Sequence, residues 1–514
     1  MDFGSDRVFK ASMIFTIRKK AISAIKKNPY FYLGVFFIII IASLLRLYNY
    51  FDRLVILGDS SRDAQIALYA VRNFTVPQIG PFAQAPFFFG PWWYWFLGLT
   101  YFLPLGIFSP WYTSTLLSFV FVYIMYVIGH KIGGKWMAAI LALFAAISPA
   151  AIGNYFSIWN PSAIPLLIAI GLLVLLKSQE TGKLRYAFLL GFIVGLSITI
   201  HFQSALFLPA ALSAVIFYKN KVKSLLLIVL GLSIPFIPIL YFDLRFNWFL
   251  SRSVFIYFLI DQPTQPLTTR WLTYVSDYWP STWSSVIGGN KYLGLFLISL
   301  TSIFTVLNLS KIREQKKYYL VAAIFFLDVI LFRYYKGPKQ IYYTYFFHPY
   351  VLIATAWVCY RLLTFQKIAG LVLTTLVVLA TIPASLATLQ DITITIRRVS
   401  EIKAQIYTSY PNQLYDIFGC SQMSGVLSHP TALMMFGEGK NSLSGIKIGV
   451  CEEGANLTWK HLGPDFVPKD WANRSTEFVY KENLEWWKER PPATGDFFGF
   501  ARRKLSPKCY PRCP

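Results

Sequence analysis

Long apolar runs alternate with short polar connectors over most of this chain. Unbroken apolar runs occur at 30–45, 187–200, 225–242 and 371–389. About 20 apolar residues in a helix cross the hydrocarbon core of a bilayer, and fewer suffice where protein shields the ends. The pattern therefore predicts an all-α polytopic membrane protein. The apolar segments lie near 30–48, 91–108, 111–129, 137–152, 161–177, 184–200, 203–217, 224–242, 291–309, 318–335, 342–364 and 367–389.

Lysine and arginine gather in several of the connectors, and they set the predicted orientation. The basic connectors carry Lys131 and Lys135; Lys177, Lys183 and Arg185; Lys219, Lys221 and Lys223; Lys311, Arg313, Lys316 and Lys317; and Arg361 and Lys367. Cytoplasmic loops are enriched in such residues, so we expect these loops and the N-terminus to be cytoplasmic. If all twelve segments crossed, the first basic connector would face outward. We therefore expect 91–108, with its aromatic cluster and Pro104, to be interfacial or re-entrant. About eleven crossings and an outer C-terminus remain.

Composition divides the chain into three predicted parts. Residues 1–29 form a basic cytoplasmic juxtamembrane segment, and 30–389 form the membrane bundle, with outer loops at 49–110 and 243–290. Residues 390–514 form a small extracytoplasmic domain of mixed or unknown fold. This last part holds 13 of the chain's 24 acidic residues and four of its five cysteines. At least one disulfide is therefore expected there, with its connectivity open.

The net charge of +24 does not indicate a nucleic-acid partner. Most of the lysines and arginines lie in the connectors between apolar runs, where they orient a chain in a membrane. We expect a multi-pass protein of the plasma membrane, in contact with membrane lipids.

Acidic residues are scarce on the predicted outer face of the bundle, so the pair in the first outer loop is informative. Asp59 and Asp63 are four residues apart, and in a helix they would share one face. Two close carboxylates can raise the pKa of one of them and give a base near neutrality, or can together hold a divalent cation. The alternative is structural, because Ser60 and Asp63 match the S-x-x-D pattern of a helix capping box.

Other polar positions at predicted span ends each have a structural alternative. Asn160, which precedes a proline, suits the start of a helix, and His201 suits an amphipathic side chain at the interface. Asp243 and Arg245 could anchor the end of a span. The tryptophans and tyrosines of 92–101 are typical of membrane-interface anchors, although aromatic faces also suit sugar rings and prenyl chains.

Positive charge also gathers in the outer loop after the span that ends near 332, although basic residues are usually enriched in cytoplasmic loops. Arg333, Lys336 and Lys339 lie there among tyrosines. Cations so placed would stabilise the charge that grows on a departing phosphate group. Snorkelling to lipid head groups is the alternative. Asp328, within the preceding span, is a functional candidate because acids in a membrane are costly.

Taken in order, these outer motifs resemble those of the GT-C glycosyltransferases, most nearly the branch of the protein O-mannosyltransferases and aminoarabinose transferases. The motifs are Asp59-Ser-Ser-Arg62-Asp63, Gly80-Pro81, Phe88-Phe89-Gly90-Pro91-Trp92-Trp93-Tyr94-Trp95, Trp159-Asn160-Pro161, His201-Phe202-Gln203 and Asp243-Leu-Arg245. The resemblance covers roughly 30–365 in layout and does not extend to 390–514. The commoner family pattern has adjacent Asp and Glu, so the wider spacing here leaves open which acid is the base.

The resemblance implies an inverting transfer of a hexosyl or pentosyl group from a polyprenyl-phosphate sugar, as in cell-envelope glycosylation. The acceptor would be a hydroxyl on a protein, glycan or lipid. Asp59 and Asp63 are the implied catalytic acids, and a divalent cation between them is left open. The implied donor-phosphate residues are Arg62, Arg245, Arg333, Lys336 and Lys339. The implied substrate-binding residues are Trp93, Tyr94, Asn160, His201 and Gln203.

The rival hypothesis is a transporter or flippase for a lipid-linked or small anionic substrate. It predicts paired ionisable residues deep within several spans and helices broken at the midplane. Asp328 is the only clear acid within a predicted span, and this scarcity favours the transferase.

Overall fold

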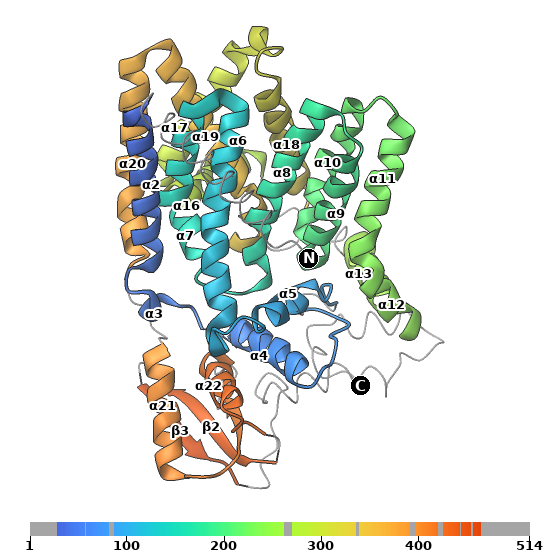
Figure 1. Cartoon of the computed structure of the whole chain (residues 1–514), viewed down its shortest axis with the longest axis vertical. Coiled ribbons are helices and arrows are strands. Elements are labelled where there is room, and N and C mark those ends of the chain that lie inside the picture. Colours follow the sequence, from blue (N-terminus) through green and yellow to red (C-terminus); the bar gives the residue numbers. More distant parts are fainter. Residues whose placement is uncertain are drawn as a thin grey trace, which may run out of the picture.

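The structure is a computed structural model, and it places a helical bundle above a small α/β domain (Figure 1). Short helices lie between these two parts. The described residues are 28–56, 58–81, 87–261, 270–335, 339–390, 396–419, 425–442, 444–453 and 456–463. The basic segment expected at 1–29 lies almost wholly outside these ranges.

The bundle is built from apolar helices that run between its two ends. Six helical stretches of the described residues are long and apolar enough to cross a membrane, and a pair bent by 98° adds a seventh. The chain is therefore a multi-pass membrane protein. The bundle helices are α2 (Pro29–Leu47), α6 (Ser109–Ile147), α8 (Ile164–Thr181), α9 (Arg185–Ile200), α10 (Leu208–Ala214), α11 (Lys221–Ser233), α12 (Ile237–Arg245), α17 (Lys291–Leu307), α18 (Lys316–Arg333), α19 (His348–Phe365) and α20 (Lys367–Ala387).

Helix α6 is two helices joined by a tight reversal. Gly133 and Gly134 have non-helical backbone angles, and Gly134 has a φ of 78°. A Cβ on Gly129 would come within 2.8 Å of the Cα of Ala138. Nine residues of straight helix would separate these positions by about 13 Å, so the chain must fold back between them. The two halves correspond to the separate apolar segments predicted at 111–129 and 137–152.

A buried arginine ties the first and last bundle helices together beside the first loop. Arg53 belongs to the single turn α3 (Tyr50–Arg53) and is fully buried. Its guanidinium donates to the carbonyls of Leu45 (2.9 Å) and Tyr48 (2.7 Å) at the end of α2, and to that of Thr388 (2.7 Å) after α20. Burial lowers the pKa of Arg53 to about 10, so it stays charged at neutral pH. These bonds fix the point from which the chain enters the next helix.

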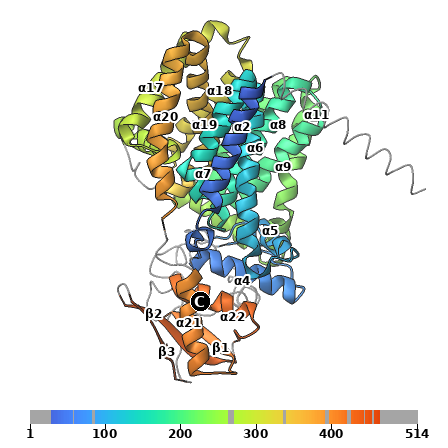
Figure 2. The same cartoon turned by 60° about the vertical axis from the view of Figure 1, so that its left-hand side comes forward.

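Two short helices, α4 (Gly58–Arg72) and α5 (Trp92–Thr100), pack against each other across one end of the bundle, which we call the α4 end (Figures 1 and 2). The nine residues of α5 extend about 14 Å, and a bilayer core is about 30 Å thick. Helix α5 is therefore too short to cross, in line with the expectation that 91–108 is not a span.

The terminal domain has a three-stranded sheet with two helices. Its elements are α21 (Ile396–Ser409), β1 (Tyr415–Gly419), α22 (Gly425–Gly437), β2 (Ile446–Glu453) and β3 (Asn456–His461). Strands β1 and β2 are parallel, and α22 connects them in the chain. Strand β3 pairs antiparallel with β2. Cys451 is disulfide-bonded and Cys359 is buried and free. Cys420, Cys509 and Cys513 lie outside the described ranges.

The terminal domain docks on α4 through α22 (Figure 2). The guanidinium of Arg72, at the end of α4, donates to the carbonyls of Phe436 (2.5 Å) and Gly437 (2.8 Å). It also lies over the ring of Phe436, with 4.9 Å to the centroid, and Tyr69 stacks on the same ring. An arginine thus satisfies the last carbonyls of α22, where the helix dipole also favours a cation.

Replacing Arg72 should loosen this docking. Arg72→Ala removes two charge-assisted hydrogen bonds and should weaken the contact by about 1.5–3 kcal/mol or more. Limited proteolysis of the purified protein should then release the terminal domain faster. Arg397→Ala is the matched control, because Arg397 is an exposed residue of α21 whose nearest acid, Glu401, is 4.0 Å away. Equal cleavage rates for the two variants would contradict this role of Arg72.

Candidate functional site

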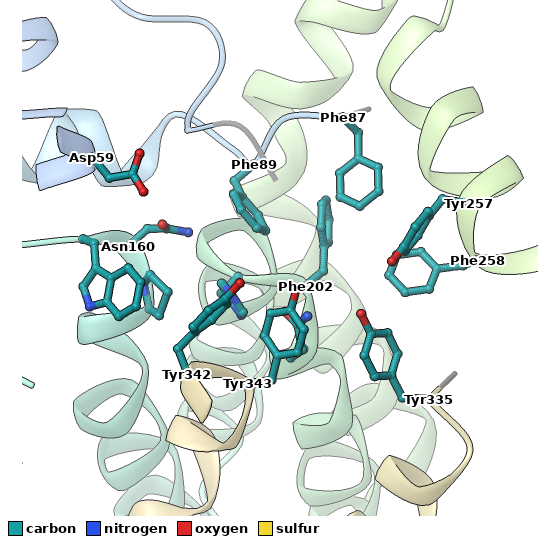
Figure 3. A pocket seen from close by; sticks show the side chains of 14 residues that line it. Asp59, Phe87, Phe89, Asn160, Phe202, Tyr257, Phe258, Tyr335, Tyr342 and Tyr343 are labelled. Carbon is teal, nitrogen blue, oxygen red and sulfur yellow. The ribbon is translucent and has the colours of Figure 1, made fainter. Parts of the chain in front are cut away.

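A pocket opens at the α4 end of the bundle, where several loops meet (Figure 3). It encloses about 720 Å³ of space, including open solvent at its mouth. Asp59 and Asn160 lie on one side of it, and Tyr257 and Phe258 lie on the opposite side. Asp59 is the one acid among the described lining residues. The lining consists of Asp59, Phe87, Phe89, Trp159, Asn160, Pro161, His201, Phe202, Gln203, Tyr257, Phe258, Tyr335, Tyr342 and Tyr343.

Two glycines allow the loop that carries the phenylalanines to reach the pocket. Gly80 donates its amide to the carbonyl of Phe89 (2.9 Å), and Gly90 donates to that of Thr199 on α9 (2.7 Å). A Cβ on Gly80 would lie 2.1 Å from the carbonyl oxygen of Gly90. A side chain is therefore excluded at Gly80. This close approach to Gly90 gives a packing reason for the glycine in the Gly80-Pro81 motif.

Three of the predicted substrate-binding residues do line the pocket. The Asn160 amide donates to the carbonyl of Ile200 (2.7 Å), which holds it against the end of α9. His201 is buried and stacks on Phe89 at 5.2 Å between ring centroids. The amide oxygen of Gln203 is buried and has no hydrogen-bond partner among the described residues. A buried acceptor of this kind is costly unless a ligand or water satisfies it.

The two predicted catalytic acids both contact Arg62. Helix α4 includes Asp59, whose side chain is 66% exposed, and Asp63, whose side chain is 1% exposed. The Arg62 guanidinium lies 2.6 Å from the Asp59 carboxylate and 2.8 Å from that of Asp63. An arginine therefore bridges the two acids. The described residues contain no group of three or more histidines, cysteines or acids that could hold a metal ion.

Asp63 is held from the second short helix as well. The Trp93 indole donates to one oxygen (3.1 Å), and the Tyr94 hydroxyl donates to the other (3.4 Å). Burial raises the pKa of the Asp63 carboxyl to about 6, and Arg62 limits the rise. Trp93 and Tyr94 were predicted to bind substrate, but their polar atoms contact Asp63, and neither side chain lines the pocket.

The structural alternative for Asp63, a capping box with Ser60, does not form. Helix α4 begins at Gly58, two residues before Ser60. The Ser60 hydroxyl instead donates to the carbonyl of Val55 at 3.4 Å. The carboxylate of Asp63 does not cap α4, because it accepts hydrogen bonds from Trp93 and Tyr94 on α5.

None of the predicted phosphate-binding cations that the structure describes lines the pocket, and each has its own contacts. Arg333 ends α18 and lies over the rings of Trp271 (5.3 Å) and Tyr274 (5.6 Å). The Lys339 ammonium donates to the carbonyl of Tyr335 (2.7 Å), a lining residue, and burial together with Arg333 lowers its pKa. Lys336 lies in a part of the chain that the structure does not describe.

The Asp243-Leu-Arg245 motif lies away from the described lining. Asp243 is fully buried and accepts hydrogen bonds from the amides of Leu250 (2.7 Å) and Ser251 (2.9 Å) at the start of α13 (Phe249–Ile256). It therefore caps that helix. Arg245 is exposed on α12 and donates to the hydroxyl of Tyr241 (3.2 Å).

Phe87, Tyr257 and Phe258 are lining residues that no sequence pattern indicates. Tyr257 and Phe258 follow α13 within the predicted outer loop 243–290, and aromatic residues are frequent throughout this chain. Their place depends on how α12 and α13 fold back towards Phe87, whose ring lies 5.3 Å from that of Tyr257.

Comparison with known proteins bears on the fold. No protein-family model and no curated protein sequence matches the chain. ArnT from Cupriavidus metallidurans in the apo state matches with a TM-score of 0.55 and 13% identity, covering 83% of this chain and 93% of ArnT. ArnT bound to undecaprenyl phosphate matches with a TM-score of 0.54 and 11% identity, covering 82% and 93%. The chain has the GT-C fold.

The prediction of a GT-C fold is thereby confirmed, and the identity is low enough that the comparison shows the fold alone. The apo oligosaccharyltransferase of Archaeoglobus fulgidus also matches, with a TM-score of 0.48 and 12% identity over 75% of this chain. The chain spans 59% of the length of that oligosaccharyltransferase.

Asp63 should change its protonation state in an unusual pH range. An ordinary aspartic acid is ionised above pH 4, whereas Asp63 should bind a proton as the pH falls through about 6. Because the folded state holds this proton more tightly, the contribution of Asp63 to stability should fall as the pH rises from 3.8 to about 6. Infrared difference spectra between these limits should show a protonated carboxyl band that is lost in Asp63→Asn. An unchanged band in that variant would contradict the assignment.

Proposed function

We propose that this chain is a membrane glycosyltransferase that moves a sugar from a polyprenyl-phosphate donor to an acceptor hydroxyl. The observation that carries the proposal is the exposed Asp59 carboxylate at the rim of an aromatic pocket, in a protein with the fold of ArnT. ArnT has been crystallised with undecaprenyl phosphate, which supports a lipid-phosphate donor. The sugar and the acceptor are not assigned.

The proposed reaction is an inverting displacement at the anomeric carbon. Asp59 accepts the proton of the acceptor hydroxyl as its oxygen bonds to that carbon. The bond between the carbon and the phosphate oxygen breaks, and its electron pair leaves with the polyprenyl phosphate. A positioned general base is worth roughly 10²–10⁴ in rate. Asp59 suits this role because its exposed carboxylate faces a space that a substrate can enter.

The aromatic and neutral polar residues of the pocket lining suit a bound sugar. Tyr342, Tyr343 and Phe89 offer aromatic faces, and aromatic rings stack on the apolar faces of sugar rings. Asn160, His201 and Gln203 offer neutral polar atoms to sugar hydroxyls, and the unpartnered amide oxygen of Gln203 is a ready acceptor.

The phosphate would lie towards the cations at the edge of the pocket. Lys339 donates to the carbonyl of Tyr335, a lining residue, and Arg333 and Lys336 lie within two residues of Tyr335 in the sequence. As charge grows on the departing phosphate, preorganised cations stabilise it. Arg62 is a further candidate because it adjoins Asp59, whereas Arg245 has its own partner in Tyr241.

We infer that the chain crosses the membrane about eleven times, with the α4 end outside. The apolar helical stretches that support this count are α2, the two halves of α6, α8, α9, 202–217, 221–245, α17, α18, α19 and α20. Lys131, Lys177 and Lys317 converge on Glu180, with the closest pair 2.6 Å apart, and all four come from connectors predicted to be cytoplasmic. Such a basic cluster fits the positive-inside rule.

Replacing the proposed base should abolish transfer without unfolding the protein. Asp59→Asn keeps the size and most hydrogen bonds of the side chain but removes the proton acceptor. Sugar transfer by the purified variant, measured as release of free polyprenyl phosphate from a labelled donor, should fall by about two orders of magnitude or more.

Asp52→Asn is the matched control, because it makes the same change on α3, away from the described lining. It should transfer at the wild-type rate. Full transfer by Asp59→Asn would remove Asp59 as the base. Movement of the intact donor across the membrane by the wild-type protein, without release of polyprenyl phosphate, would favour the transporter hypothesis.

Removing a cation beside the pocket should weaken donor use instead. Arg333→Ala should raise the KM for the polyprenyl-phosphate sugar by about tenfold or more, since a charge-assisted contact is worth about 1.5–3 kcal/mol. Lys291→Ala removes a cation that pairs with Asp277 at 2.9 Å and serves as control. An unchanged KM in Arg333→Ala would show that the phosphate is bound elsewhere.

A further inference from the structure

The first two turns of α4 contain two acids in opposite surroundings. Asp59 is 66% exposed and lines the pocket, whereas Asp63 is 1% exposed and does not. An exposed carboxylate samples several side-chain conformations, and holding one of them costs conformational entropy. A base must instead keep its oxygen within hydrogen-bond reach of the acceptor hydroxyl.

Arg62 supplies such a constraint because it contacts both acids with different nitrogens. One terminal nitrogen lies 2.6 Å from Asp59. The Nε (3.1 Å) and the other terminal nitrogen (2.8 Å) both donate to a single oxygen of Asp63. The guanidinium is a rigid planar fork, so fixing one edge on Asp63 sets the direction of the remaining nitrogen.

Asp63 is in turn fixed by the neighbouring helix. Its other oxygen accepts from the Trp93 indole at 3.1 Å, and Trp93 is itself buried. A longer contact of 3.4 Å comes from the hydroxyl of Tyr94. Both oxygens of Asp63 therefore have donors within the protein, and neither is presented to the pocket.

We propose that Asp63 is a positioning residue that acts through Arg62: the Trp93–Asp63–Arg62 chain of contacts aims the Asp59 carboxylate into the pocket. This inference rests on the proposed role of Asp59 as the base. It replaces the expectation that Asp63 is itself catalytic, and it explains why the two acids stand one turn apart.

The test compares two indole substitutions on one helix. Trp93→Phe keeps an aromatic ring but removes the hydrogen bond to Asp63. Trp95→Phe removes a bond of similar length, 2.9 Å, from α5 to the carbonyl of Pro77. The kcat for sugar transfer should fall by about three- to tenfold in Trp93→Phe with little change in the donor KM, as expected when only transition-state positioning is lost. Trp95→Phe should keep the wild-type kcat.

A double-mutant cycle tests the order of the contacts. Asp63→Asn and Arg62→Gln should each lower kcat by about tenfold to a hundredfold, and the double variant should be no slower than Arg62→Gln alone, because both changes break one chain. Multiplicative effects would overturn the proposal. If Asp63→Asn fails to fold, the two indole variants still decide, and an unchanged kcat in Trp93→Phe would overturn it.

The activities of the Asp59 and Asp63 variants distinguish a wrong positioning role from a wrong assignment of the base. If Asp59→Asn abolishes transfer while Asp63→Asn and Trp93→Phe leave kcat unchanged, Asp59 remains the base and the positioning role is wrong. If Asp59→Asn keeps full transfer while Asp63→Asn abolishes it, the two roles are exchanged and both statements are wrong.

Discussion

The ion pairs between one guanidinium and two carboxylates at the start of α4 are the constraint on which the site depends. A carboxylate as buried as that of Asp63 is stable only with charged and hydrogen-bonding partners, and Arg62 and Trp93 supply them. Because Trp93 belongs to α5, the need to satisfy one buried acid locks α4 against α5. The rim of the pocket is thereby built on a rigid pair of helices rather than on a mobile loop.

Helix α4 also joins parts of the molecule that are far apart in sequence. Its first turn faces the pocket, and its last turn holds the carbonyl end of α22 through Arg72. Behind it, Arg53 fixes the chain to the ends of α2 and α20. A helix of 15 residues spans about 22 Å. The described part of the terminal domain, within 396–463, therefore rests on the same rigid element that carries Asp59 and is connected to the site through it.

The helical membrane bundle could be predicted from the sequence, because a long apolar run indicates a helix in contact with lipid. The place of Asn160, His201 and Gln203 in the lining agrees with the motif order. The capping box failed because a local spacing of three residues cannot reveal that Asp63 is bonded from Trp93, thirty residues away. Tyr257 and Phe258 were missed for the same reason, since a long-range turn brings them to the pocket.

The separation of charge around the pocket fits the demands of the proposed transfer. Arg62 already contacts Asp59, and a further cation within the aromatic lining would bind the phosphate where the sugar belongs. The described lining carries no lysine or arginine. Lys339 bonds to the carbonyl of the lining residue Tyr335, whereas Arg333 lies over Trp271 and Tyr274, which do not belong to the described lining. The space beside Asp59 is therefore lined by aromatic and neutral polar side chains, Gln203 and His201 among them, and such a lining suits an uncharged sugar better than a phosphate.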